Sequence, residues 1–290
     1  MLKDFEPLRI ATEGAEINLV KGGDGPPLLL LHGYPQTLAM WHKVMPGLAE
    51  RFTVVASDLR GYGDSSKPPG GDDHAGYAKR AMALDQVEVM RALGFERFFV
   101  AGHDRGGRVA HRMALDHADA VARLAVLDIV PTHKIFATTD KALATAYYHW
   151  FFLIQPYDLP ETLIGANPEY YLRNKFGRGS ADPEAITPEA FGEYLCCFED
   201  PAAIHASCED YRAAASIDLE HDDADLETKL ACPLLALWGE KAAMHRLYDV
   251  LACWRERAAD VRGRALPCGH YLPEEAPEET AAELMRFFAG

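Results

Sequence analysis

Residues 102–107 read GHDRGG, with Asp104 at the centre of the segment. The preceding residues 97–101 (RFFVA) form a short, mostly apolar run typical of a buried strand, and residues 107–115 carry apolar side chains at helical spacing. Glycines on both sides of Asp104 leave room for a tight turn. The segment therefore predicts a strand, a sharp turn and a helix, with the Asp104 side chain projecting from the end of a sheet.

A carboxylate at such a turn favours one kind of chemistry. A serine there attacks acyl carbon, whereas a carboxylate can displace a leaving group from saturated carbon and form an ester that water must then open. A carboxylate is already ionised near pH 7 and needs no base to activate it. We therefore predict that Asp104 is a nucleophile.

Outward from this turn, short apolar strands alternate with helical segments. Strands are predicted at residues 27–31, 53–57, 124–128, 233–238 and 261–266, and helices at about 77–93 and 277–288. This order predicts an α/β fold with a mostly parallel sheet covered by helices on both faces. Residues 132–226 are rich in aromatics and prolines without strand-like runs, and we expect a helical cap there, inserted after the sixth core strand. The predicted core comprises residues 1–131 and 227–290.

Two further chemical groups follow predicted strands. Asp128 ends one strand and His270 lies just past the last one, so both can meet Asp104 at one edge of the sheet. His270 is the expected base for the water that opens the ester, with Asp128 orienting its imidazole. Glu240 also follows a strand, and position alone does not separate it from Asp128 as the orienting acid.

Arg105 and Arg108 lie three residues apart at the start of the predicted helix, so they share a face close to Asp104. Guanidinium groups bind a planar carboxylate through paired donors. One ion pair near ~4 Å contributes roughly 4 kcal/mol at an effective dielectric constant of about 20. Two such pairs can outweigh the repulsion of an anionic substrate by a chain of net charge −15. The alternative is that these arginines only neutralise Asp104 or Asp128.

Taken together, the motifs resemble those of the fluoroacetate dehalogenase family of α/β hydrolases, over nearly the full length. The matching segments are HGYPQT (32–37), DLRGYGDSSKP (58–68), GHDRGGRVAHR (102–112), LDIVPT (127–132), YYHWFF (147–152), DYRAAASID (210–218) and CGHYLPEEAP (268–277). HDRGGR combined with HW and a downstream DYR is the most specific part. The resemblance implies an α/β-hydrolase fold.

The resemblance also implies roles for individual residues. Asp104 is the nucleophile, Arg105 and Arg108 bind the substrate carboxylate, and Asp128 with His270 hydrolyses the ester. The departing halide is received by His149, Trp150 and Tyr211, which offer N–H and O–H donors, although aromatic packing of a cap is the plainer explanation for Trp150 or Tyr211 alone. The backbone N–H groups of Tyr34 and Arg105 form the expected oxyanion site. Tyr34 departs from the family, where phenylalanine is more common.

The expected reaction is hydrolytic dehalogenation of haloacetates, in which fluoroacetate and water give glycolate and fluoride. The nearest alternative is an epoxide hydrolase that uses Tyr148 and Tyr211 to protonate the ring oxygen, but epoxide hydrolases favour an apolar or indole side chain where this chain has Arg105. A preference for chloro or bromo acids, or a non-catalytic receptor on the same fold, are further alternatives.

Composition limits the partners. The net charge of −15 argues against nucleic acid and anionic membrane surfaces. Neither a metal-ligand cluster nor a nucleotide-binding motif is present in the sequence, so no metal and no cofactor are expected. The first residues lack a secretion signal and long apolar runs are absent, which favours a cytoplasmic protein. The family resemblance implies a homodimer.

Overall fold

The computed structural model describes residues 1–182 and 184–290. An eight-stranded sheet with the order β1-β2-β4-β3-β5-β6-β7-β8 runs through the core. The strands are β1 (Glu6–Ala11), β2 (Glu16–Gly22), β3 (Pro27–Leu31), β4 (Thr53–Ser57), β5 (Phe98–His103), β6 (Val121–Leu127), β7 (Leu234–Gly239) and β8 (Val261–Leu266). β1 pairs with β2 and β2 with β4 in antiparallel fashion, and the remaining pairs are parallel. The predicted α/β fold is confirmed.

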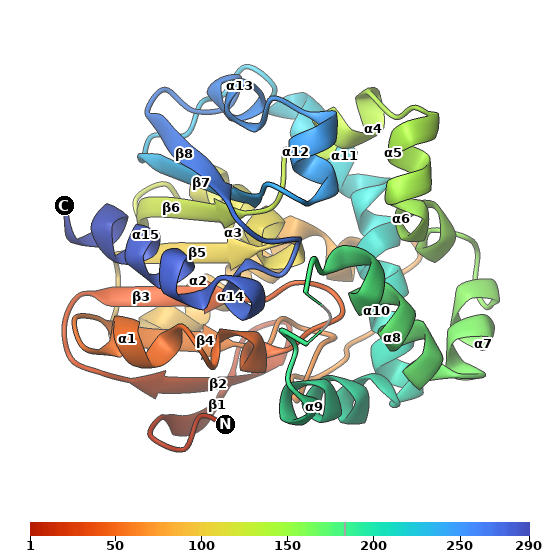
Figure 1. Ribbon diagram of the computed structural model, residues 1–290, viewed down its shortest axis with the longest axis horizontal. Helices are drawn as coiled ribbons and strands as arrows, with labels where there is room; N and C mark the ends of the chain where they lie inside the picture. The colour runs from red at the N-terminus through yellow and green to blue at the C-terminus, as the bar shows by residue number, and fades with distance from the viewer. Residues whose placement is uncertain (183) are drawn as a thin grey trace.

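Helices cover both faces of the sheet (Figure 1). One face carries α1 (Met45–Ala49), α14 (Leu272–Glu275) and α15 (Pro277–Ala289), and the other carries α2 (Lys79–Ala92) and α3 (Arg105–Asp116). Short helices η1 (Leu38–Trp41), η2 (Ala75–Tyr77), α12 (Ala243–Leu247) and α13 (Val250–Arg255) lie in the connections. Because both faces are covered, the central strands are apolar throughout, and the side chains at positions 28–31 of β3 are fully buried.

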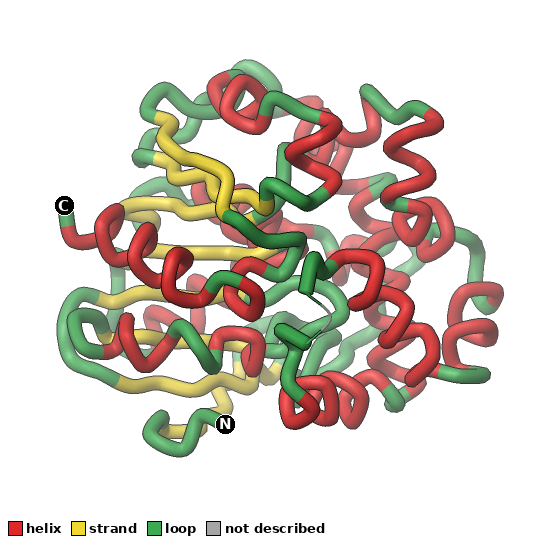
Figure 2. Tube along the Cα trace, in the orientation of Figure 1, coloured by secondary structure: helices red, strands yellow, loops and turns green. Residues whose placement is uncertain are grey.

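The described residues between β6 and β7 form helices joined by loops, and they lie at the carboxyl ends of the parallel strands (Figure 1 and Figure 2). Its helices are α4 (Thr132–Ala137), α5 (Lys141–Ala146), α6 (Tyr148–Leu153), α7 (Leu159–Gly165), α8 (Pro168–Gly179), α9 (Pro188–Phe198), α10 (Pro201–Ala214) and α11 (Ile217–Ala224). Several of the prolines are the first residues of helices, where the missing N–H costs nothing. Among the described residues, no helix is both long and apolar enough to cross a bilayer.

The turn around Asp104 is built by close backbone contacts. A side chain at Gly102 would lie 2.4 Å from the Gly106 carbonyl oxygen, and one at Gly106 would lie 2.4 Å from the His32 carbonyl oxygen. Asp104 itself has φ 45° and ψ −112°, a conformation that non-glycine residues rarely adopt. Such strain persists only where surrounding contacts enforce it, and it is typical of functional sites.

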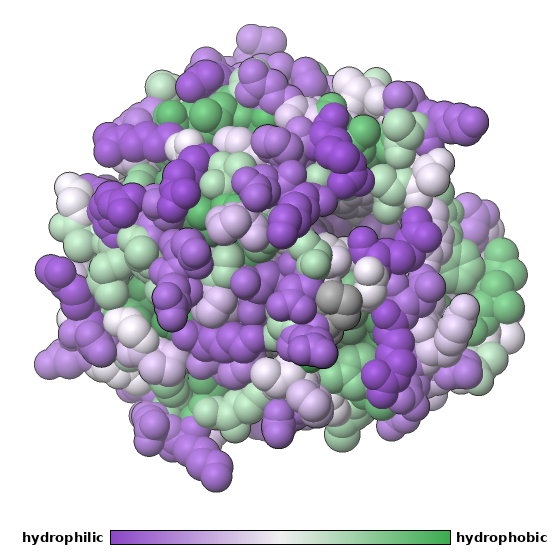
Figure 3. Space-filling view, viewed as in Figure 1, coloured by the Kyte–Doolittle hydropathy of each residue, from purple (hydrophilic) through white to green (hydrophobic). Residues whose placement is uncertain are grey.

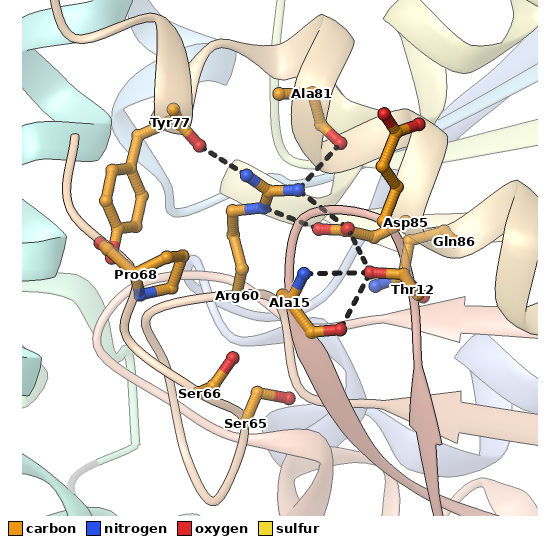
Figure 4. A network of polar contacts seen from close by, with 12 residues as sticks. Thr12, Ala15, Arg60, Ser65, Ser66, Pro68, Tyr77, Ala81, Asp85 and Gln86 are labelled. Atoms are coloured by element: carbon orange, nitrogen blue, oxygen red, sulfur yellow. Dashed lines mark hydrogen bonds and ion pairs between the residues drawn. The ribbon is translucent and has the colours of Figure 1, made fainter. Parts of the chain in front are cut away.

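A buried ion pair fixes the loop that follows β4. The Nε and Nη2 atoms of Arg60 donate to the two carboxylate oxygens of Asp85 at 2.5 and 2.6 Å (Figure 4). The Thr12 hydroxyl donates to the same carboxylate at 2.7 Å, and Arg60 Nη1 donates to the Gly76 carbonyl at 2.8 Å. The network therefore ties the loop to α2 and to the β1–β2 hairpin.

Replacing Asp85 with alanine is expected to lower the free energy of unfolding by about 3–5 kcal/mol, because Arg60 would keep a buried charge without its partner. Urea denaturation measures this change. Glu16→Ala is the matched control, since it removes an ion pair with Arg9 in which both side chains are about half exposed, and such pairs contribute about 0–1 kcal/mol. An Asp85→Ala loss as small as that of the control would show that the network is not stabilising.

Candidate active site

Asp104, Asp128 and His270 meet at the carboxyl edge of the sheet. Asp104 is the residue before α3, Asp128 directly follows β6, and His270 precedes α14. The His270 Nδ1 atom lies 2.6 Å from Asp128 Oδ2, and the Gly239 N–H donates to Asp128 Oδ1 at 3.0 Å. The side chains of all three residues are at least nine-tenths buried. The pair is thus arranged so that Asp128 holds the imidazole by Nδ1 and leaves Nε2 for chemistry.

Glu240, the other acid considered for this role, lies just past the end of β7 with an exposed side chain. None of the hydrogen bonds or ion pairs of the described residues joins it to His270. Of the two acids, the geometry therefore favours Asp128 as the orienting group.

The carboxylate of Asp104 accepts a hydrogen bond from the Tyr34 backbone N–H at 3.1 Å, through Oδ2. Burial raises the pKa of the Asp104 carboxyl, but the neighbouring His270 imidazole and the guanidinium groups of Arg108 and Arg105 outweigh that effect and hold the pKa below its ordinary value. Asp104 is therefore ionised at neutral pH, which is the state that a nucleophilic carboxylate requires.

Arg105 is fully buried and is held by an acid that the sequence analysis did not assign. Its Nε and Nη2 atoms donate to Asp210 Oδ2 and Oδ1 at 2.8 and 2.7 Å, and Nη2 also donates to the Asp210 carbonyl at 2.9 Å. Tyr62 and Lys79 also donate to this carboxylate. The arginine thus has an acidic partner, as the neutralisation alternative requires, but the partner is Asp210 rather than Asp104 or Asp128. Its Nη1 has no hydrogen-bond partner among the described residues.

Arg108 has no carboxylate partner among the residues that the structure describes. Its Nη1 donates to the Val130 carbonyl and to the Thr132 hydroxyl, each at 3.0 Å, while Nε is buried without a partner. Arg108 lies 4.5 Å from the centre of the Trp150 ring. Stacking and hydrogen bonds fix the plane of the guanidinium and leave donors free for an anion.

The aromatic side chains from the helical segment close over this region. The ring centres of His149 and Trp150 lie 5.8 and 5.9 Å from that of Tyr211, and Tyr34 packs against Tyr211 at 5.3 Å. Trp150 Nε1 and the Tyr211 hydroxyl are buried without a partner in the described part of the chain. A buried donor that lacks a partner costs roughly 1–3 kcal/mol, so ordinary packing is a poor explanation for both. They are arranged as a binding site for an acceptor or anion would be.

Burial lowers the pKa of His149 well below its ordinary value, so its imidazole is neutral and carries a single N–H donor. The Tyr34 hydroxyl is directed elsewhere, since it donates to the Tyr171 hydroxyl at 3.0 Å. The structure thus places the Tyr34 backbone N–H at Asp104, while the Tyr34 hydroxyl is hydrogen-bonded to Tyr171 of α8.

A cavity of about 220 Å³ opens next to this site. Its lining includes Asp128, Tyr147, His149 and His270, so it reaches the edge of the group formed by Asp104, Asp128 and His270. A volume of this size suits a small molecule rather than a polymer. Among residues 1–182 and 184–290, no cluster of three or more His, Cys, Asp or Glu side chains is arranged to hold a metal ion.

Comparison with known proteins gives one consistent family. A family model described as an alpha/beta hydrolase fold matches residues 26–277. A fluoroacetate dehalogenase from a Burkholderia species is 50% identical over 290 residues, covering 100% of this chain and 95% of that protein. A soluble epoxide hydrolase from a Corynebacterium species is 38% identical over 280 residues, covering 95% and 94% of the two chains.

A solved structure of an α/β hydrolase from Nostoc sp PCC 7120 superposes with a TM-score of 0.99 at 64% identity, and the match covers 99% of both chains. The resemblance inferred from the sequence motifs is confirmed by the full-length match to the Burkholderia protein. The chain belongs to the fluoroacetate dehalogenase family of the α/β hydrolases.

Proposed function

We propose that this protein is a haloacetate dehalogenase, which converts fluoroacetate and water to glycolate and fluoride. The observation that carries the proposal is an ionised carboxylate at the turn, surrounded by buried donors that lack partners among the described residues: Arg105 Nη1, Arg108 Nε, Trp150 Nε1 and the Tyr211 hydroxyl. The Burkholderia relative, a fluoroacetate dehalogenase, supports the same reaction.

The first step is substrate anchoring. The free donors of Arg105 and Arg108 bind the carboxylate of the haloacetate, and Asp210 keeps Arg105 in place by occupying its other donors. With the acid group fixed, the neighbouring carbon is held near Asp104, so part of the entropic cost of the reaction is met on binding.

The second step is displacement. A carboxylate oxygen of Asp104 attacks the CH₂ carbon, the carbon–halogen bond breaks, and the halide leaves with the bonding electron pair. The N–H and O–H donors of His149, Trp150 and Tyr211 replace the hydration that the halide would have in water. The product of this step is an ester between Asp104 and a carboxymethyl group.

The third step is hydrolysis of that ester. His270 accepts a proton from water through Nε2, and Asp128 stabilises the resulting imidazolium. The water oxygen adds to the carbonyl carbon of the Asp104 ester, and the oxyanion is stabilised by the backbone N–H groups of Tyr34 and Arg105. On collapse the carbon–oxygen bond to the carboxymethyl group breaks, and the His270 imidazolium gives its proton to the departing glycolate oxygen. The Asp104 carboxylic acid that remains loses its proton to solvent, and the carboxylate is restored with one oxygen from water.

Epoxide hydrolysis is the second candidate, because the Corynebacterium relative is a soluble epoxide hydrolase. It would use Tyr148 and Tyr211 as proton donors. The structure favours the dehalogenase, because two buried arginines with free donors stand beside the nucleophile, and a neutral epoxide gives these charges nothing to bind.

The proposal also covers the domain organisation, the assembly and the location of the protein. Residues 132–226 act as a cap over a core of residues 1–131 and 227–290. The exposed apolar residues Tyr157, Leu159, Leu163 and Tyr170 on and beside α7 and α8 support pairing of two copies as a homodimer, and Figure 3 shows hydrophobic side chains gathered over α7 at the right-hand edge. The six cysteines are unpaired in the described structure, which fits a reducing, cytoplasmic location.

The proposal is tested by measuring fluoride release from fluoroacetate, with chloroacetate and a neutral haloalkane as companion substrates. The Arg108→Leu protein is expected to lose about 10²-fold or more in kcat/KM on the haloacetates, because one of the two anion-binding cations is gone. Activity on the neutral haloalkane, where any is found, should fall much less. Equal losses on charged and neutral substrates would show that Arg108 is structural, and turnover of an epoxide without halide release from any haloacid would favour the second candidate.

The pH dependence of kcat/KM for fluoroacetate should reflect the titration of Lys175, a buried residue of α8 that lines the cavity. Burial lowers its pKa to about 8, although the negative charges of Asp104 and Asp128 oppose the shift and Arg178 adds to it. Its positive charge is present below that pH and is lost as the pH rises through it, so kcat/KM for fluoroacetate should decline roughly fivefold there. The decline should be absent in Lys175→Met and shifted to higher pH in Lys175→Arg. A profile of unchanged shape in both variants would assign the decline to another group.

A further inference from the structure

We propose that Lys175, Arg178, Lys241 and Arg246 form a cationic entrance that collects carboxylate substrates and passes them to the site at Asp104. All four line the cavity that reaches His149 and His270. The inference rests on the proposed function and deepens it, since it names how an anionic substrate enters a protein of net charge −15.

The charge of this cavity is unusual for the chain. Of its lining residues, one is a carboxylate, Asp128, and that group already binds His270 at 2.6 Å. The chain has 44 acidic and 29 basic side chains, so an acidic neighbour is available to most cations. Several cations elsewhere on the protein pair with such an acid, as Arg173 does with Glu169 and Lys134 with Glu256. Within the described residues, none of the four entrance cations lies within ion-pair distance of a carboxylate.

The four side chains come from opposite sides of the opening. Lys175 and Arg178 are three residues apart on α8, which places them on one helical face, whereas Lys241 follows β7 and Arg246 belongs to α12. Arg246 Nη1 donates to the Lys241 carbonyl at 3.0 Å, and Arg178 lies 5.2 Å from the centre of the Tyr148 ring. The surface between α8 and α12 is hollowed and bordered by hydrophilic side chains (Figure 3). The opening is thus held by contacts that leave the charges unneutralised.

Exposure of the cationic side chains falls from the opening of the cavity toward the residues around Asp104. Arg178, Lys241 and Arg246 are exposed, Lys175 is 8% exposed, and Arg105 and Arg108 at the end are 0% and 3% exposed. A concave surface lined by one sign of charge focuses its field and raises the local concentration of the opposite ion. Like charges held close together are unfavourable on their own, so their clustering without acids points to an anion that passes between them. The substrate thus meets exposed cations first and then Lys175, which is largely shielded from bulk water.

The test compares two double variants that remove the same charge. Arg178→Gln with Lys241→Gln alters the entrance, while Arg51→Gln with Arg97→Gln removes two exposed cations that precede β4 and β5, at the opposite edge of the sheet. At about 0.01 M of a halide-free salt, the entrance variant is expected to lose roughly fivefold in kcat/KM for fluoroacetate relative to the control variant, mainly through KM. At about 1 M salt, where the Debye length is about 3 Å, the two variants should converge.

A second measurement separates this inference from the proposed reaction. Calorimetric binding of acetate at low salt should weaken in the entrance variant and not in the control, whether or not any haloacetate is turned over. Arg178→Lys with Lys241→Arg, which keeps both charges, should bind and react as the native protein does. The inference would be overturned if the two Gln double variants had equal effects on both acetate binding and kcat/KM. It would also be overturned if the effect of the entrance variant persisted at high salt. An absence of halide release from the native protein would instead contradict the proposed function.

Discussion

Asp104→Asn protein is expected to release fluoride from fluoroacetate at least about 10⁴-fold more slowly than the native protein, as loss of a nucleophile does in other hydrolases. The amide keeps the size of the side chain and can still accept the Tyr34 N–H bond seen at 3.1 Å. It lacks the negative charge that attacks carbon. Measurement with a fluoride electrode over long incubations gives the rate directly.

The stability of the Asp104→Asn protein is the control for this measurement. Because Asp104 is strained and buried, the variant should be at least as stable as the native protein in urea, which separates lost chemistry from lost fold. A folded Asp104→Asn protein with near-native fluoride release would show that another group attacks the substrate.

His270→Gln is expected to stop the reaction after its first half. One equivalent of halide per active site should appear rapidly, and steady turnover should then be about 10²–10⁴-fold slower than native, because the base that activates water is missing. Intact-protein mass spectrometry should find the carboxymethyl ester, and peptide mapping should locate it on Asp104.

Asp128→Asn provides the companion measurement. It removes the carboxylate that lies 2.6 Å from His270 Nδ1, so it should also accumulate ester, whereas Glu240→Gln at the exposed neighbouring acid should not. A His270→Gln protein that shows neither a halide burst nor a trapped ester would contradict a covalent intermediate.

The sequence could predict the central strands of the sheet and the place where Asp104, Asp128 and His270 meet, because both follow from local patterns. Continuous apolar runs identified the central strands, and groups that follow parallel strands necessarily lie at one edge. The β1–β2 hairpin was not located from the sequence, since β1 is largely exposed and shows no apolar run. The antiparallel edge of the sheet therefore became visible only in three dimensions.

The pairing of Arg105 with Asp210 shows what local patterns do not contain. The two residues are far apart in sequence and come from different parts of the fold, yet they share three hydrogen bonds in a fully buried position. The DYR motif contained Asp210, but its neighbour Tyr211 received the functional role. The pairing left no local signal, because Arg105 lies 105 residues before Asp210 in the chain.

The cationic entrance was similarly hidden, because its members are spread over residues 175–246 and no segment among them is rich in basic residues. From the sequence, only Arg105 and Arg108 were predicted to offset the repulsion between an anionic substrate and this acidic protein. The structure adds cations along the approach. Local field rather than net charge then governs encounter with the substrate.

A single turnover in water enriched in the heavy oxygen isotope, with enzyme in excess over fluoroacetate, follows each oxygen atom through the reaction. Attack by Asp104 predicts that the glycolate formed carries an ordinary oxygen taken from the enzyme, and that the heavy isotope is found in the Asp104 carboxylate. Heavy oxygen in the glycolate of the first turnover, with none in Asp104, would mean that water attacks the substrate directly and would contradict nucleophilic catalysis by this residue.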